Sequence, residues 1–216
     1  WHHDESGSVE NDHRREIHSV SVTMNFYQLS SKSSNPETPD KTWFAEAQSS
    51  ILCKGCSSAR SVVKPVDVVL QTKPDKSALN FVHGVHIHIA SVQLLETLFP
   101  DGPSEVLRLG KVLGPRREEA SEHRTIMASN HILVRGDERS SFRVCPDCGR
   151  VWYSAIGKRY ILKRNLLKGD VFETQSGNLI VTEQIANRVA DKSWRNLVVN
   201  KLEVRDAPVD GLDVPD

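Results

Sequence analysis

Four cysteines are the residues of this 216-residue sequence with the clearest chemical potential. They occur as two C-x-x-C pairs, Cys53 with Cys56 and Cys145 with Cys148. A C-x-x-C turn places two thiolate sulfurs close enough to share one ion, and structural zinc prefers four such ligands in a tetrahedron. The pattern therefore predicts one structural zinc ion per chain, held by all four cysteines.

The second pair has the sequence of a well-formed metal-binding turn. Pro follows Cys145, and Gly149 follows Cys148, so that the chain can adopt a positive φ while backbone N–H groups approach the sulfurs. The flanking segments 142–144 and 150–153 have the composition of two strands. We expect these strands to form a zinc-ribbon-like hairpin that carries both cysteines.

The first pair is less regular, because Ser57 follows Cys56 where Gly would be expected. This serine must either accept a left-handed backbone or alter the turn. The gap between the pairs, residues 57–144, is 88 residues long, whereas a compact ribbon has about 15 to 20. We therefore expect a long α+β subdomain inserted between the two halves of the zinc site.

Two other interpretations of the cysteines are a redox dithiol and a set of unconnected free thiols. A thioredoxin-like pair opens a helix within a βαβ unit, and neither pair has that context. Four cysteines in a chain of this length are also too few for a secreted disulfide scaffold. The zinc interpretation accounts for both pairs with a single ion.

A group of histidines, His83, His86 and His88, is a second candidate for chemistry. The segment 82–90 alternates apolar and polar residues and predicts a half-buried strand, with His86 and His88 on its polar face. Two imidazoles in an H-x-H pattern can hold a catalytic metal, but no third-ligand motif follows. We expect a polar outward face and leave a second metal at His86 and His88 open.

Composition limits the other classes of function. Lys and Arg total 28, as do Asp and Glu, so there is no overall basic field for nucleic acid or anionic lipid. The basic stretch 158–164, beside Trp152 and Tyr153, supports the alternative of a zinc-ribbon nucleic-acid-binding module. No apolar run approaches the roughly 20 residues that span a bilayer, and we expect a cytoplasmic protein with no membrane partner.

Motifs of catalysis are missing from the sequence. The segment 107–114 lacks the glycine and hydroxyl positions of a phosphate-binding loop, and no G-x-S-x-G elbow is present. We expect Gly110 and Gly114 to shape a turn before Pro115, and the mixed-charge run 116–124 to form a solvated helix or loop. The sequence therefore contains neither of these two catalytic motifs, and the residues alone leave a metalloenzyme centred on His86 and His88 open.

The fold class predicted is α+β. A single zinc-stabilised domain is expected over 24–205, preceded by a disordered extension, 1–23, and followed by a flexible Pro- and Asp-rich tail, 206–216. We expect translation of the native protein to begin at Met24. Local patterns predict strands at 26–29, 62–70, 178–181 and 197–204, a helix at 92–99 capped by Ser91, and a helix after Thr182 that buries Ile185 and Val189.

Several of these features occur in the same order in one known family. The opening Met24-Asn-Phe-Tyr, the two widely separated C-x-x-C pairs, the Gly-Pro ending of 107–115 and the Asp-x-Phe step of 168–172 before the strand at 178–181 carry the likeness. On these residues the chain resembles the double-CXXCG motif family of Myxococcus paralogues, which includes swarming-inhibition immunity proteins. Ser57 in place of Gly, and Leu109 in place of Pro, mark a divergent member.

The resemblance implies a function that the residues alone do not give. It implies an immunity protein that binds and neutralises a cognate toxin delivered by related cells. On that reading the chain has no catalytic residues, its partner is the toxin, and the specific contacts lie on exposed surface that the sequence does not identify. Oligomeric state is also left open.

Overall fold

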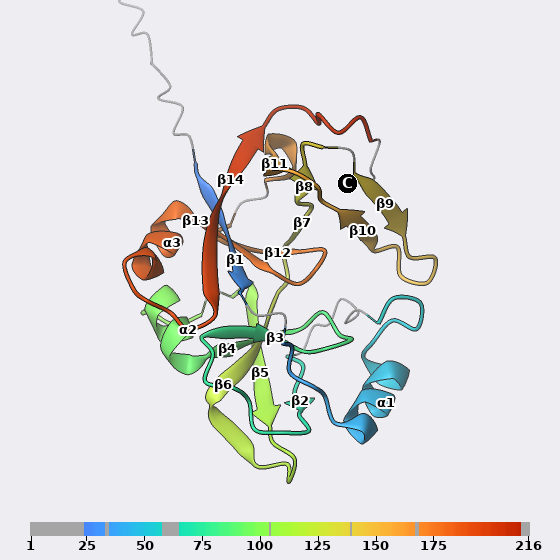
Figure 1. The fold of residues 1–216 in the computed structure, drawn as a ribbon, viewed down its shortest axis with the longest axis vertical. Coiled ribbons are helices and arrows are strands. Elements are labelled where there is room, and N and C mark those ends of the chain that lie inside the picture. The colour runs from blue at the N-terminus through green and yellow to red at the C-terminus, as the bar shows by residue number, and fades with distance from the viewer. Residues whose placement is uncertain are drawn as a thin grey trace, which may run out of the picture.

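The computed structural model describes residues 24–32, 35–57, 65–103, 105–138, 140–166 and 169–212. The expected extension 1–23 and the start of the expected strand 62–70 lie outside these ranges. The described chain is a mixed α+β fold made mostly of strands (Figure 1). Its strands form a seven-stranded sheet, a five-stranded sheet and a two-stranded hairpin.

The seven-stranded sheet has the order β7-β12-β13-β1-β14-β11-β8. Its centre is β1, which pairs antiparallel with β13 on one side and with β14 on the other. The pairing of β1 with β14 therefore brings the N-terminal and C-terminal parts of the described chain together in one sheet. Its strands are β1 (Phe26–Ser31), β7 (His131–Ile132), β8 (Arg135–Gly136), β11 (Arg159–Leu162), β12 (Val171–Thr174), β13 (Leu179–Thr182) and β14 (Leu197–Arg205).

The five-stranded sheet has the order β2-β5-β6-β4-β3 and arises entirely from the segment between the two cysteine pairs. The end of that segment does not stay with it, because β7 and β8 join the seven-stranded sheet. The remaining two strands, β9 and β10, pair only with each other. The strands are β2 (Val68–Val69), β3 (Leu79–Phe81), β4 (His88–Ser91), β5 (Leu107–Leu113), β6 (Glu119–Ala128), β9 (Ser141–Val144) and β10 (Val151–Ser154).

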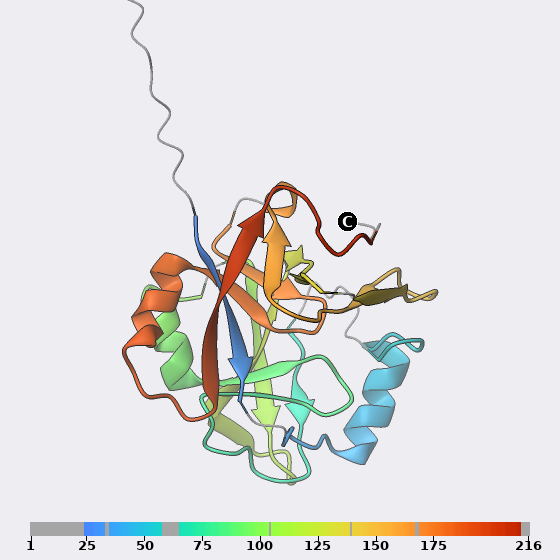
Figure 2. The same ribbon diagram turned by 45° about the horizontal axis from the view of Figure 1, so that its top comes forward.

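Three α-helices and a short 3-10 turn, η1 (Lys163–Asn165), complete the described fold. Helices α2 (Val92–Leu98) and α3 (Glu183–Ala190) lie side by side, as Figures 1 and 2 both show. Ser91 caps α2 as expected, with its Oγ accepting the Leu94 N–H at 3.2 Å. Among the described helices, none has the length and apolar character needed to cross a bilayer.

Both faces of the seven-stranded sheet are buried, since alternate residues of its central strands enter different cores. In β13, Leu179 and Val181 pack with α2 and α3, while Ile180 between them packs with Phe172 on the other face. The helix after Thr182 buries Ile185 and Val189 in the first of these cores, as the i, i+4 spacing predicts.

Helix α1 (Lys41–Ser50), which the sequence analysis did not predict, covers the five-stranded sheet. Asp40 caps it by accepting the N–H groups of Thr42 and Trp43, each at 3.0 Å. Only Trp43 and Ala47 of the helix are buried, so its apolar stripe is too narrow to stand out in sequence. Leu52 follows directly and is fully buried in the same core, which fixes the start of the first cysteine pair.

Three local predictions are corrected. The expected strand 82–90 is a strand only from His88, because the chain turns at Gly84, where φ is 73°. Gly110 lies inside β5 instead of a turn, with the Val66 backbone packed against it. The run 116–124 is neither helix nor loop from Glu119 onward, because β6 starts there and pairs with β5.

The segment 206–212, which we expected to be part of a flexible tail, is held against the body of the protein. The Asp210 side chain is fully buried and forms two 2.8 Å contacts with the Arg135 guanidinium, through Nε and Nη2. The same Nη2 donates to the Leu212 carbonyl oxygen at 2.6 Å. The composition of this segment predicted a tail because it contains no sign of Arg135, the buried cation that binds Asp210. Arg135 lies 75 residues earlier in the chain.

Candidate metal centre

Two separate parts of the fold each present one cysteine pair. Cys53 and Cys56 sit in the turn that follows α1, and Cys145 and Cys148 sit at the tip of the β9–β10 hairpin. The predicted flanking strands of the second pair are confirmed, with Val144 opposite Val151 in an antiparallel register. The two turns face each other across the site.

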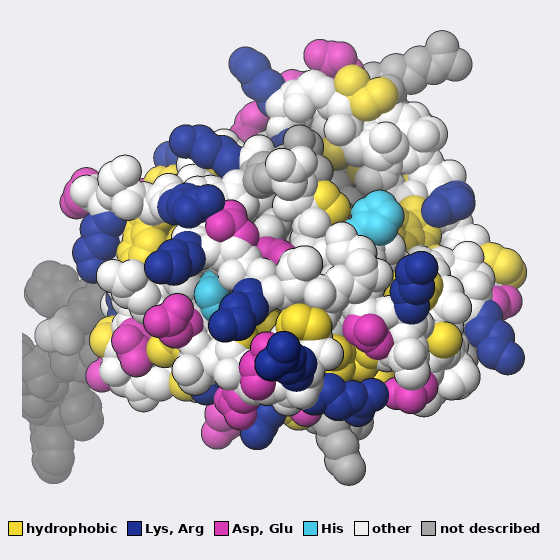
Figure 3. Space-filling view, turned by 60° about the horizontal axis from the view of Figure 1, so that its bottom comes forward, with side chains coloured by type: hydrophobic (Ala, Val, Ile, Leu, Met, Phe, Trp, Pro, Cys, Tyr) yellow, Lys and Arg dark blue, Asp and Glu magenta, His cyan; other side chains and the backbone are white. Residues whose placement is uncertain are grey.

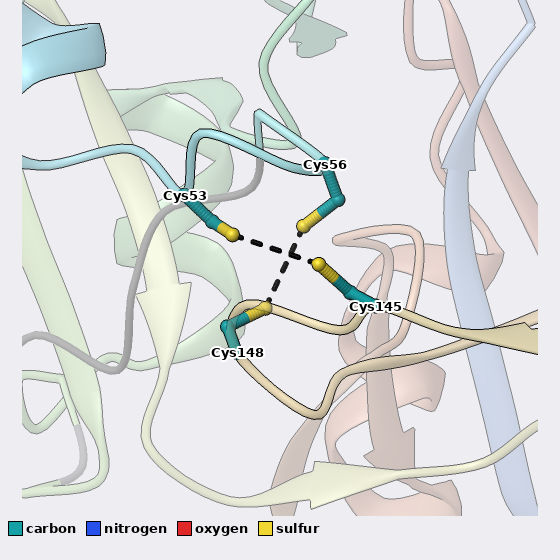
Figure 4. A group of neighbouring side chains, drawn as sticks. All are labelled: Cys53, Cys56, Cys145 and Cys148. Atoms are coloured by element: carbon teal, nitrogen blue, oxygen red, sulfur yellow. Dashed lines mark hydrogen bonds between the residues drawn. The ribbon is translucent and has the colours of Figure 1, made fainter.

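The four sulfurs converge to within 4.8 Å of one another (Figure 4). The Cys53 and Cys145 sulfurs are 3.7 Å apart, and those of Cys56 and Cys148 are 3.6 Å apart. With a zinc–sulfur bond of about 2.3 Å, a tetrahedron of sulfurs has edges of about 3.8 Å. The four cysteines therefore fit a metal ion that is held by four thiolate ligands in a tetrahedron. None of the four forms a disulfide.

The two turns have matching backbone geometry. The Ser57 N–H donates to the Cys53 carbonyl oxygen at 2.7 Å, and the Gly149 N–H donates to the Cys145 carbonyl oxygen at 2.9 Å. Gly149 has φ of 72°, and Ser57 has φ of 55°. Of the two outcomes expected for Ser57, the structure shows the left-handed backbone, so the first turn keeps the form of the second despite its missing glycine.

Gly55 allows the two turns to approach. A Cβ atom built at this position would lie 2.8 Å from Asp147 Oδ2 and 3.1 Å from the Cys145 sulfur. A side chain here would therefore press against both the second turn and one of the ligands. The importance of this glycine is visible only once the two turns are placed together.

Without a cation, the Cys148 sulfur is a poor thiolate, because its pKa is raised. Burial raises the pKa of the Cys148 thiol to about 12, and the three neighbouring cysteine sulfurs also raise it. A bound divalent cation reverses this balance, because its charge stabilises the thiolates directly. The chemistry of the donor set thus favours a metal-bound state over four packed thiols.

The hairpin that carries the second pair is anchored to the seven-stranded sheet. Tyr153 in β10 is buried, and its hydroxyl donates to Asp210. Tyr160 in β11 donates to the same carboxylate at 3.3 Å. Burial would raise the pKa of Asp210, but hydrogen bonds from Arg135 and Tyr153 hold the pKa of this carboxyl well below its usual range. No local signal in the sequence marks Asp210 as buried, so this anchor is visible only in the structure.

The other side of the hairpin contacts the histidine group. The His86 and Trp152 rings are 4.3 Å apart between centroids. Burial, followed by the charge of Arg150, lowers the pKa of His86 to about 4, and burial lowers the pKa of His88 to about 4. His88 is only 5% exposed, so the expected outward polar face is wrong for this residue.

His86 and His88 line a hollow of about 250 Å³ together with Ser176 and Asn178. Among the described residues, the four cysteines are the one group of three or more His, Cys, Asp or Glu side chains close enough to hold a metal ion. No third ligand of these types therefore joins the two histidines in the described part of the chain. Both imidazoles are neutral near pH 7 because of their low pKa values.

A buried carboxyl lies at the junction of the two large sheets. Glu173 in β12 is 1% exposed, and its Oε2 accepts the Ala128 N–H at 2.9 Å. Its Oε1 has no hydrogen-bond partner among the described residues. Burial raises the pKa of Glu173 to about 7, although the Ala128 hydrogen bond and the charge of Arg150 oppose the rise.

The basic stretch 158–164 places its charges on the surface and its aromatic residue inside. Lys158, Arg159 and Lys163 are exposed, whereas Tyr160 is fully buried and holds Asp210. Of the two aromatic residues beside the stretch, Tyr153 is buried in the same network, and Trp152 is half-buried with its ring against His86. Tyr153 and Tyr160 are therefore not placed to stack on bases, which is how aromatic side chains bind single-stranded nucleic acid.

Comparisons with known proteins add no identification. A scan of the chain against protein-family models found no match, and a search of curated proteins found none either. The likeness to the double-CXXCG motif family therefore rests on the residues named in the sequence analysis. The metal-binding geometry stands independently of that likeness.

Proposed function

We propose that the four cysteines hold one zinc ion in a zinc-ribbon-like site, and that this ion is structural. The observation that supports the proposal is the convergence of four sulfurs from two turns that lie 92 residues apart in sequence. Four protein ligands leave no open coordination position for a substrate, which is the arrangement of structural zinc sites. The ion would join the turn after α1 to the hairpin anchored on the seven-stranded sheet.

Metal analysis tests this proposal directly. Chain purified without added metal should contain about one zinc per chain, measured by elemental analysis against protein concentration. Four thiolates in a tetrahedron also suit iron, so finding iron in place of zinc would overturn the identity of the ion. A metal content near zero after purification under reducing conditions would overturn the site itself.

We further propose that the protein is an immunity protein that acts in the cytoplasm by binding a cognate toxin, without catalysis. The support is the resemblance to the double-CXXCG motif family, together with a geometry in which the two C-x-x-C pairs work as one unit. A metal-braced fold with a projecting hairpin suits a rigid binding surface, because a preformed surface loses little entropy on association. The proposed partner is a protein toxin encoded beside this chain.

A protection assay decides this second proposal. Cells that express the neighbouring toxin gene should survive only when this chain is co-expressed, and the two proteins should copurify. Deletion of the gene for this chain in the producing strain should make that strain sensitive to its own toxin. If the deletion strain stays fully resistant, the immunity proposal fails, while the zinc proposal is unaffected.

A further inference from the structure

A second site candidate lies far from the cysteines, beside the start of α2 and the loop that precedes β14. There the surface encloses a hollow of about 630 Å³. Three cationic side chains line it, Lys76, Lys192 and Arg195, and Glu122 is the one carboxylate among the described residues of its wall. Figure 3 shows the lower face of the molecule, on which Lys and Arg side chains are interspersed with Asp and Glu side chains.

The floor of the hollow is polar and buried. His123 in β6 is opposite Ser91 at the end of β4, and directly opposed residues of an antiparallel pair have neighbouring side chains. His123 is 5% exposed, and its Nε2 has no hydrogen-bond partner among the described residues. His123 is one of the residues that line the hollow. Ser91 lines the same hollow and offers a hydroxyl hydrogen.

The loop that carries two of the cations is fixed in place. The Arg195 carbonyl oxygen accepts the Ala78 N–H at 2.8 Å, which ties the loop to the start of β3. Asn196 holds a left-handed backbone, with φ of 65°, next to Arg195. The Lys192 Nζ lies 5.9 Å from the centre of the Trp194 ring. Because this wall is already ordered, a ligand would not lose affinity by ordering it.

We propose that this hollow binds a small phosphate monoester. The wall carries three cations and one carboxylate, and Asp75 pairs with one of the cations, Arg195, so the hollow keeps a net positive charge that suits an anion. A phosphate supplies three strong acceptor oxygens for Lys, Arg and hydroxyl donors. Asp75 holds the Arg195 guanidinium at 2.9 Å and so limits its rotamers. Trp194 adds an aromatic surface for the rest of the ligand. This site is independent of the zinc and of the proposed toxin.

Calorimetric titration of the zinc-loaded full chain with adenosine monophosphate tests the proposal. This probe combines a phosphate monoester with a planar ring that can pack on Trp194, and adenosine is the matched compound without phosphate. We expect the nucleotide to bind at one site and adenosine to bind at least about tenfold more weakly. Lys192→Ala should weaken nucleotide binding by about tenfold, since it removes an exposed cation of the wall without touching the core.

Lys41→Ala is the control, because Lys41 is an exposed lysine at the start of α1, well away from the hollow. This variant should bind the nucleotide like the unchanged chain at the same ionic strength. The proposal is overturned if the nucleotide does not bind at millimolar concentration, or if adenosine binds equally well. It is also overturned if Lys41→Ala and Lys192→Ala weaken binding equally, because attraction would then come from general surface charge.

Discussion

The burial of Glu173 can be tested by a substitution at a position away from the four cysteines. We consider Glu173→Gln, which keeps the size of the side chain and an acceptor for the Ala128 N–H but removes the titrating proton. The carboxyl has a pKa of about 7 in the folded chain, against 4.5 as its ordinary value, with burial as the main cause. One pKa unit corresponds to about 1.4 kcal/mol, so the full difference is worth about 3 kcal/mol.

The direction of the effect follows from proton binding. Between pH 4.5 and about 7 the unfolded chain has lost the Glu173 proton while the folded chain retains it. The free energy of unfolding therefore falls as pH rises through this window, and above pH 7 the loss is complete. The amide of the Glu173→Gln variant does not titrate, so the stability of the variant minus that of the unchanged chain should rise by about 3 kcal/mol between pH 4.5 and pH 8.

Urea denaturation followed by circular dichroism, at several pH values with zinc present throughout, measures this difference. Comparing the two proteins at each pH cancels any protonation of the cysteines, which both share. Glu46→Gln, on the exposed face of α1, is the control for replacing a glutamate with glutamine. A difference for Glu173→Gln that is flat from pH 4.5 to pH 8 would refute the argument, since the carboxyl would then titrate alike in both states.

Three further predictions concern the metal centre and its supports. Cys145→Ser should lose the zinc and unfold the chain at 25 °C, because structural zinc contributes about 10 kcal/mol or more, which is comparable with the stability of a whole domain. The control, Ser141→Ala on β9, should stay folded. A Cys145→Ser chain that stays folded with its zinc bound would contradict the proposed architecture. Gly55→Ala should lose zinc to a chelator more readily than the unchanged chain, because the new Cβ would press on Asp147 and on the Cys145 sulfur. The control, Ser49→Ala on α1, should retain zinc like the unchanged chain. If both variants retain zinc equally well, the two turns do not meet as described. Asp210→Asn should lower the free energy of unfolding by about 3 to 5 kcal/mol, because it leaves the buried Arg135 without its counter-charge. The control, Asp206→Asn at an exposed position, should change the free energy of unfolding by less than about 1 kcal/mol. A similar loss of stability in both variants would show that Asp210 is not buried.

Local patterns predicted those parts of the fold whose stability is settled by near neighbours. The strands around the second cysteine pair, the cap at Ser91 and the buried stripe of the helix after Thr182 depend on residues within a few positions, and the structure has all three. The left-handed backbone of Ser57 is one of the two outcomes that the sequence left open at this position. The set of four cysteines could be named for the same reason, because C-x-x-C spacing is itself a local constraint.

The remaining features depend on partners that are distant in sequence. A helical stripe as narrow as that of α1 is stabilised by the five-stranded sheet, so its own residues give a weak signal. The sequence predicts an exposed His88, but in the structure this residue is buried. The sequence likewise places Asp210 in a tail, but in the structure Asp210 is paired with the buried Arg135. Burial of a polar side chain is decided by what packs over it, and the sequence around that side chain does not contain this information.

The sequence by itself identified the four cysteines that could hold a metal ion, because sulfur chemistry and the spacing of two residues within a turn are fixed by the chain. Only the tertiary structure determined that the two turns meet, with sulfurs at 3.6 and 3.7 Å, and that a side chain at Gly55 would press on Asp147 and on the Cys145 sulfur. The hollow around His123 likewise exists only after β4, β6 and the loop before β14 are assembled. Bringing these segments together requires the two sheets to bury their apolar faces, and that burial is a property of the whole chain.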